Sequence, residues 1–168
     1  MPGAGASSAL WATLPRPFAS LEAMRLRVEI ADEDGVRALP ELPGGGAAFV
    51  AFLSFALARG LGGQHPLTAL AEHLRREHRL SLGPFERFYE GVAEDEEDAA
   101  LLERMWQPAA ELREAVGGLA ACLRSGDVGR VLAERGAAPA LAEEAAALWE
   151  LLEEPANRGA QVRLSYEL

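Results

Sequence analysis

The sequence contains no lysine, a single cysteine and no apolar run long enough to cross a membrane. All 16 basic residues are arginines, and 26 aspartates and glutamates outnumber them, which gives a net charge of −10. This charge argues against general affinity for nucleic acid or anionic lipid, so we expect no nucleic-acid partner and no membrane association. Cys122 cannot form an intramolecular disulfide or a CxxC motif. No basic segment precedes the first apolar residues, and we expect a cytoplasmic location.

Motifs that indicate a particular chemistry are also missing. The chain has no GK[ST] phosphate-binding loop, no GxGxxG on a strand–helix unit, no HExxH and no GxSxG. The sequence therefore favours a protein that is not an enzyme, although it does not decide the question.

The length of 168 residues suits one domain with a substantial core. Residues 1–23 are rich in Ala, Gly, Ser and Pro, and we predict that they form a poorly ordered extension. Trp11 and Phe18 argue against a tail with no role. Residues 24–168 are predicted to form a single helical domain.

The most apolar segment is 47–58, in which no residue is charged and only Ser54 is polar. A helix that is apolar on all sides belongs inside a core, and this one is too short to span a bilayer. We predict a central buried helix over residues 47–59, surrounded by a bundle of about five to six helices.

The two ends of this domain alternate between apolar and polar residues, which is typical of half-buried strands. We predict strands at 25–30 and 161–168, paired antiparallel as a ribbon. In the expected register, Arg25 lies opposite Glu167 and Glu29 lies opposite Arg163, because opposite charges favour such pairs. A ribbon of two strands is marginal in water. It must therefore lie on the helices, gain a third strand or pair with another subunit.

The residues between these strands have helical spacing. Pro66 begins one helix, and Gly83-Pro84 is predicted to begin another that carries Phe85, Phe88, Tyr89 and Val92 on one face. An apolar stripe from Leu101 to Leu123 continues through Pro108, which favours one kinked helix, with a break at Pro108 as the alternative. The last helix runs from Pro139 to Pro155. The predicted fold class is mainly α (α+β).

Two segments are candidates for binding an anionic ligand. Gly44, Gly45 and Gly46 precede the central helix, where exposed N–H groups can bind phosphate or carboxylate; a flexible connector is the simpler interpretation. Arg75, Arg76 and Arg79 form a local excess of positive charge. These arginines can also pair with the acidic half of the chain, since residues 86–154 hold 17 acids and six arginines.

The histidines do not form a local metal-binding motif. His73 and His78 lie five positions apart, about 140° around a regular helix, so one regular helix would not let them share a metal as an i,i+4 pair does. His65 precedes Pro66 in a different element. We predict no metal and no cofactor, with a site formed by tertiary convergence as the alternative. The acidic run Glu94–Asp98 is explained by the start of a helix.

Trp106 and Trp149 each lie one position away from an apolar stripe. They either widen the core or mark an interface, where Trp is enriched. The leading hypothesis is a non-enzymatic interaction or regulatory protein that acts as a homo-oligomer, most simply a dimer. The second is a small-molecule-binding protein or enzyme that holds an anionic ligand between the three glycines and the three arginines. The third is an acidic mimic or inhibitor of a nucleic-acid-binding protein.

Overall fold

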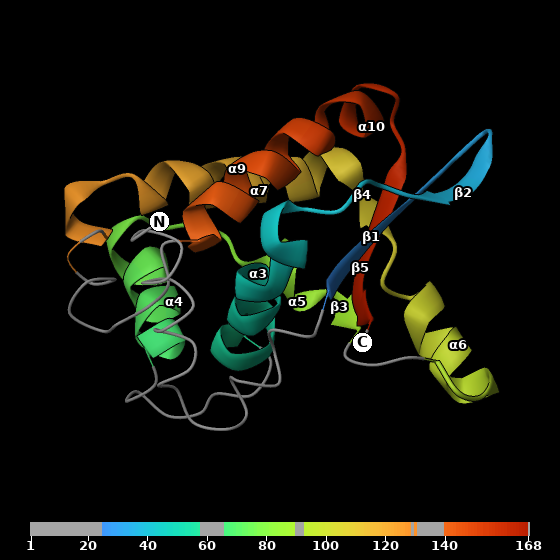
Figure 1. The fold of residues 1–168 in the computed structure, drawn as a ribbon, viewed down its shortest axis with the longest axis horizontal. Helices are drawn as coiled ribbons and strands as arrows, with labels where there is room; N and C mark the ends of the chain where they lie inside the picture. The colour runs from blue at the N-terminus through green and yellow to red at the C-terminus, as the bar shows by residue number, and fades with distance from the viewer. Residues whose placement is uncertain (1–24, 58–65, 90–92, 129, 131–139, 168) are drawn as a thin grey trace.

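The computed structural model describes residues 25–57, 66–89, 93–128, 130 and 140–167, and its fold class is α+β (Figure 1). The predicted extension over residues 1–23, His65 and Pro139 lie outside the described residues. Within the described ranges, no helix combines the length and the hydropathy needed to cross a membrane.

The described strands form one sheet of five. The strands are β1 (Arg25–Asp32), β2 (Gly35–Ala38), β3 (Phe88–Tyr89), β4 (Gln107–Pro108) and β5 (Gln161–Glu167). Their order is β2-β1-β5-β3, and β4 also pairs with β5. The pairing of β3 with β5 is parallel and the others are antiparallel.

The long pair β1–β5 has the register expected from the sequence. Arg25 lies opposite Glu167, Val28 opposite Leu164 and Glu29 opposite Arg163. The Glu29 and Arg163 side chains form an ion pair of 3.0 Å between Oε1 and Nε. The ribbon gains three further strands from its own chain, and α3 packs on β1. These contacts supply the support that a two-stranded ribbon lacks, so the ribbon does not by itself require a second subunit.

The predicted central helix is present but changes its hydrogen bonding midway. After the 3-10 turn η2 (Pro43–Gly46), α3 spans Ala47–Ala51 and a π-helical segment, η3, continues over Phe52–Leu57. Residues 48–53 are almost fully buried, as an apolar helix in a core should be. Residues 58 and 59, the predicted end of this helix, lie outside the described residues.

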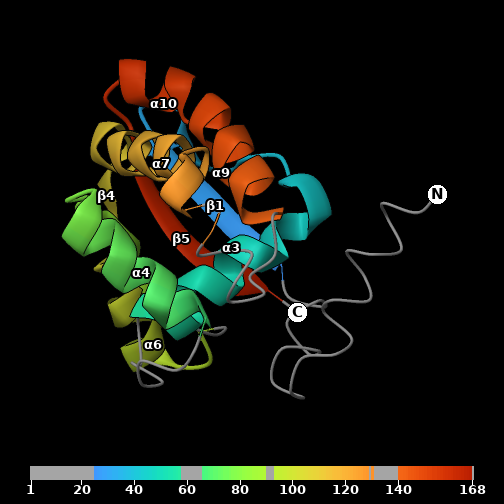
Figure 2. The same ribbon diagram turned by 90° about the vertical axis from the view of Figure 1, so that its left-hand side faces the viewer.

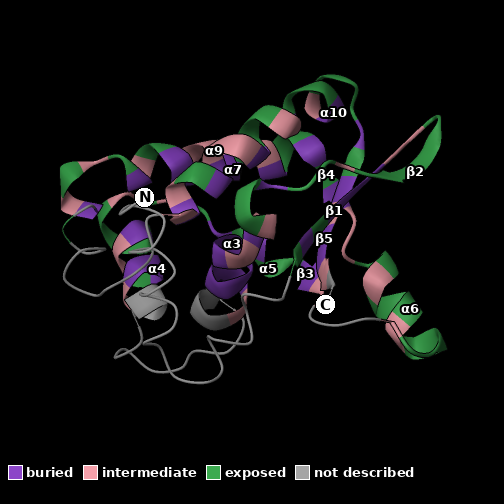
Figure 3. Cartoon of the chain, viewed as in Figure 1, coloured by how far each residue is buried: buried purple, intermediate pink, exposed green. Residues whose placement is uncertain are grey.

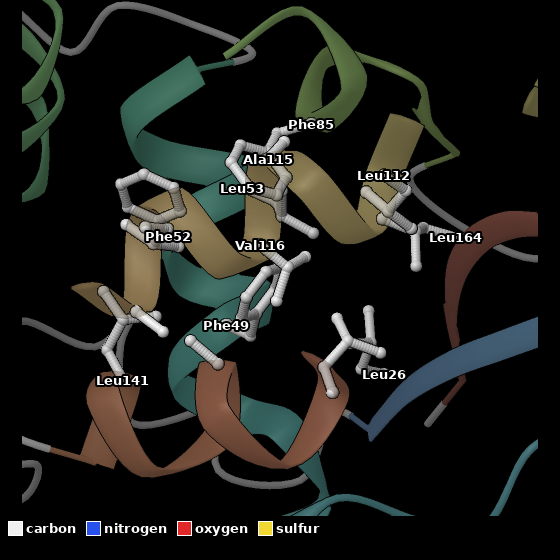
Figure 4. Close-up of a cluster of buried hydrophobic side chains, with 14 of the residues drawn as sticks. Leu26, Phe49, Phe52, Leu53, Phe85, Leu112, Ala115, Val116, Leu141 and Leu164 are labelled. Carbon is white, nitrogen blue, oxygen red and sulfur yellow. The ribbon is translucent and has the colours of Figure 1, made fainter. Parts of the chain in front are cut away.

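The core joins this central helix to the sheet and to the helices that cover it. Figure 2 shows α3, α7 (Ala109–Leu123) and α9 (Ala140–Leu151) in front of β1 and β5. The buried residues cluster where these elements meet (Figure 3). Phe49, Phe52 and Phe85 contact one another edge to face, with ring centroids 5.8–6.4 Å apart (Figure 4).

Two helix predictions were wrong. The stripe through Pro108 is not one kinked helix: α6 (Glu96–Glu103) ends first, Gln107 and Pro108 form β4, and α7 begins at Ala109. Pro108 is extended at ψ 128° and cannot donate a helical hydrogen bond. The helix at Gly83 is also short, because α5 covers only Gly83–Glu86 and β3 follows it beside β5. Val92 lies outside the described residues.

The other helices follow their sequence patterns. α4 spans Pro66–Glu77. Asp95 caps α6 by accepting the Asp98 N–H at 2.8 Å, and acidic residues occupy the first turn of that helix, as predicted. α9 packs along α7, and α10 (Glu153–Asn157) follows it. Pro155 therefore lies within α10 and does not end the last helix. The predicted apolar stripe, which lies on α9 and ends one residue after it, is buried: Leu141, Ala145, Leu148 and Leu152.

Candidate functional site

The candidate site begins at the C-terminal end of α4. The N–H groups of His78 and Leu80 both donate to the carbonyl of Leu74, at 3.2 and 3.1 Å. Arg79, between them, has φ +52°, a left-handed conformation that is common just after the end of a helix. The helix therefore stops at Glu77, and His78 lies just beyond its last turn.

Asp127 brings the two histidines together from another element. It lies four residues after α7, where the next helical turn begins. One carboxylate oxygen, Oδ2, is 2.7 Å from Nε2 of His73 and 2.8 Å from Nε2 of His78. The two imidazole rings are 5.6 Å apart between centroids. All three side chains are partly exposed, so the cluster is accessible from solvent. We call it the His–His–Asp cluster.

The cluster holds Asp127 in its ionised form. The hydrogen bond with His73 is the largest cause that lowers the pKa of Asp127 well below its ordinary value, followed by those with Ser125 and His78. Ser125 also donates to the Cys122 carbonyl at 2.6 Å. An ionised carboxylate beside two imidazoles is the donor set that a divalent transition metal prefers.

The geometry suits a tetrahedral ion. One donor atom from each of the three residues lies within 4.8 Å of the others. Zinc binds nitrogen and oxygen ligands at about 2.0–2.2 Å, so its donors lie about 3.4 Å apart. The two nitrogen–oxygen distances of 2.7 and 2.8 Å are shorter than this value, so the side chains must move slightly apart to admit the ion.

The sequence left a shared site for the two histidines open only through tertiary convergence, and the structure brings them together in that way. α4 ends between them, and the third donor comes from another element. The sequence analysis missed Asp127 as a site residue, since it is 54 and 49 positions from the histidines. A local motif cannot report a contact at such separations.

A groove lies beside this cluster, between α7 and the segment that follows α4. Its volume is about 720 Å³, and its lining includes His78, Arg79, Glu111, Glu114 and Cys122. This volume is typical of a small-molecule site. Burial raises the pKa of the Cys122 thiol, and the charge of Asp127 adds to the effect. Cys122 is therefore a neutral lining group and not an activated nucleophile.

The helix start predicted to bind an anion already holds a carboxylate of this chain. Gly44, Gly45 and Gly46 have φ of +64°, +71° and +75°, and a Cβ on Gly46 would lie 2.7 Å from Cβ of Leu26. Glycine is required there for the backbone path. Beyond them, Glu144 of α9 accepts the N–H of Phe49 at 2.9 Å and that of Ala48 at 3.4 Å.

Glu144 is almost completely buried, at 3% exposure. Burial raises its pKa to about 7, although the two backbone N–H groups act in the opposite direction. The helix N-terminus favours a negative charge, so desolvation outweighs the hydrogen bonds here. Glu144 occupies the position that an external carboxylate would take.

The predicted arginine patch divides between different surroundings. Nη2 of Arg75 lies 3.8 Å from Oε1 of Glu86, which agrees with pairing to the acidic half of the chain. Arg76 is exposed, and Arg79 lines the groove. None of the three glycines lines that groove; the nearest side chains to Gly45 and Gly46 come from Arg25, Leu26 and Leu42.

Both predicted interface tryptophans contact an arginine of the same chain. The Arg113 guanidinium carbon lies 4.0 Å from the ring centroid of Trp149, and that of Arg163 lies 4.4 Å from Trp106. Arg113 also donates to the Trp149 carbonyl at 3.1 Å. Trp149 remains 40% exposed. These contacts account for the positions of both tryptophans within one chain, and an interface at either of them stays a prediction.

Comparison with family models, with curated proteins and with solved structures finds no match for this chain.

Proposed function

We propose that this chain is a zinc-binding regulatory protein in which His73, His78 and Asp127 hold the ion. The single observation that supports this proposal is the approach of both Nε2 atoms to one carboxylate oxygen, at 2.7 and 2.8 Å. Imidazole and carboxylate ligands suit zinc. The bound ion would link the end of α4 to the segment after α7, and so make the packing of the two regions depend on metal.

Among the described residues, three side chains can hold the ion, and this number favours a regulatory or ligand-binding role over a purely structural one. Structural zinc sites have four protein ligands, whereas sites with three keep a position for water or another ligand. Zinc must also displace any proton on Nε2, so binding is expected to weaken in acid.

The test is zinc titration of the metal-free full chain in competition with a chromogenic chelator. We expect one zinc per chain for the wild type. His73→Gln and Asp127→Asn should each lower the affinity by at least about tenfold. Glu72→Gln, an exposed change beside His73, is the matched control and should leave the affinity unchanged. Equal uptake by all four proteins, or no saturable uptake, would contradict the proposal.

Self-association is a second candidate, and the edge strand β2 is the observation that favours it. All four residues of β2 are exposed, with Val36 at 59%, and β2 lies at one end of the sheet. An uncovered edge can pair with a second copy of the same strand. Size-exclusion chromatography with light scattering should give a dimer for the wild type and a monomer for Val36→Lys. A monomeric wild type at tens of micromolar would exclude this candidate.

A further inference from the structure

The groove beside the His–His–Asp cluster follows one face of α7. Its α7 residues include Glu111, Glu114, Gly118 and Cys122, which recur every three or four positions as one helix face does. Glu111 and Cys122 are eleven positions apart, so this face is about 16 Å long at 1.5 Å per residue. The groove is therefore long enough for an extended ligand.

One end of the groove carries positive charge when zinc is bound. His78 belongs both to the His–His–Asp cluster and to the groove lining, so the proposed ion lies beside this end. Arg79 is the next residue and lines the groove as well. Zinc held by three side chains accepts a further ligand, and an arginine nearby favours a carboxylate.

The other end carries negative charge. Glu111 and Glu114 lie one turn apart near the start of α7, and both are exposed. Within the described residues, neither glutamate forms an ion pair, and neither does Arg79. The charged groups at both ends are thus available to a ligand and are not used by the described part of the fold.

Apolar groups line the groove between these ends. Leu80, Pro84 and Ala115 contribute to the lining. A Cβ on Gly118 would lie 2.6 Å from Cδ1 of Leu80, so the leucine side chain lies directly against the helix backbone. This arrangement suits a ligand with a hydrocarbon centre.

We propose that the groove binds an extended zwitterion, an aminoalkyl carboxylate or short peptide. Its carboxylate lies at the His78–Arg79 end, and its ammonium group lies at Glu111 and Glu114. The proposal rests on the zinc site proposed above, because without the ion the negative charge of Asp127 offsets the positive charge of Arg79 at the carboxylate end. A ligand with only one of the two charges satisfies only one end of the groove.

The test is calorimetry on the zinc-loaded full chain with 8-aminooctanoate, octanoate and octylamine as probes. Zinc content is measured first. We expect 8-aminooctanoate to bind at least about tenfold more tightly than either singly charged probe, since each charged contact contributes about 1.4 kcal/mol or more. The double variant Glu111→Gln/Glu114→Gln should lose that preference and keep its affinity for octanoate. Glu150→Gln/Glu153→Gln, at exposed positions on and just after α9, is the matched control and should behave as the wild type.

The two proposals fail in different ways. If the chain takes up no zinc, the zinc site is contradicted and the zwitterion proposal falls with it. If zinc binds but the three probes bind equally, or none binds, only the zwitterion proposal is overturned. Loss of octanoate binding in the Glu111→Gln/Glu114→Gln variant would also overturn it, because that result would place the carboxylate at the wrong end.

Discussion

Two carboxylates from the C-terminal half of the chain each contact a helix of the N-terminal half, one inside the core and the other at the surface. Glu144 is buried and accepts hydrogen bonds from two backbone N–H groups at the start of α3. Asp127 is partly exposed and accepts hydrogen bonds from two imidazole nitrogens at the end of α4. Burial raises the pKa of Glu144 to about 7, whereas His73, Ser125 and His78 lower the pKa of Asp127.

The difference shows that hydrogen bonds alone do not determine the charge of a carboxylate. Both groups accept at least two hydrogen bonds, yet their pKa values move in opposite directions, because desolvation is the largest cause for Glu144 and hydrogen bonding is the largest cause for Asp127. The consequence for function is equally different. Glu144 is a structural tie inside the core, whereas Asp127 keeps its charge at a solvent-accessible site where a cation can compete for it.

The largest expected effect comes from removing the buried carboxylate. Glu144→Ala leaves the N–H groups of Ala48 and Phe49 without their acceptor and opens a cavity, which should lower the free energy of unfolding by about 3 kcal/mol. Glu143→Ala, an exposed change on the same helix, should cost less than about 0.5 kcal/mol. Urea denaturation compares the two. Equal losses would show that Glu144 does not hold α3.

The pH dependence of stability provides the next test. The pKa of Glu144 rises from its ordinary value of 4.5 to about 7 in the folded chain, so the folded state binds this proton more tightly than the unfolded state. Stability from this group is therefore full below pH 4.5 and is lost as the pH rises toward 7, by about 3 kcal/mol in total.

Glu144→Gln isolates this contribution because glutamine does not titrate. The free energy of unfolding of the wild type minus that of Glu144→Gln should fall across the same pH range. A difference that stays flat, or that rises with pH, would contradict the raised pKa.

Zinc should distinguish the two carboxylates directly. At a free zinc concentration one hundred times the dissociation constant, the wild type should gain about 2.7 kcal/mol, seen as a higher melting temperature. Glu144→Gln should gain the same amount, since its carboxylate lies away from the ion. Asp127→Asn should gain almost nothing. A similar zinc effect in all three proteins would place the ion elsewhere.

The smallest effect concerns the turn that presents His78. Arg79 has φ +52°, and a non-glycine residue in this conformation costs about 1 kcal/mol. Arg79→Gly should therefore stabilise the metal-free chain by up to about that amount, while zinc affinity changes little because Arg79 is not a ligand. Arg76→Gly, within α4, should instead destabilise by about 1 kcal/mol. Thermal denaturation of both variants checks the signs.

The two long strands of the sheet and most helix faces could be predicted because their signals are local. Alternation defined β1 and β5, and the charges of Glu29 and Arg163 favoured the register that the structure has. One kinked helix was favoured over the break at Pro108 because apolar residues on either side kept helical spacing. What ends the helix is nonlocal: Gln107 pairs with Val162 and donates to the Pro84 carbonyl at 2.8 Å.

The candidate site was harder to predict than the fold because it depends on contacts between residues far apart in the sequence. His73 and His78 were visible in the sequence, but the end of α4 between them depends on a turn in which an arginine takes a conformation typical of glycine. Asp127 reaches them only through the packing of distant segments. Similarly, the glycines before α3 indicated an anion site at the helix start, but nothing local identified Glu144 as the carboxyl group that occupies it.

X-ray absorption at the zinc edge, on the full chain loaded with one zinc, tests the central claim most directly. We predict two imidazole nitrogens and one or two oxygens at about 2.0–2.2 Å, with no sulfur ligand. Asp127→Asn should change the oxygen shell or lose the ion. A shell of oxygens alone, or a sulfur at about 2.3 Å from Cys122, would contradict the His–His–Asp cluster as the zinc site.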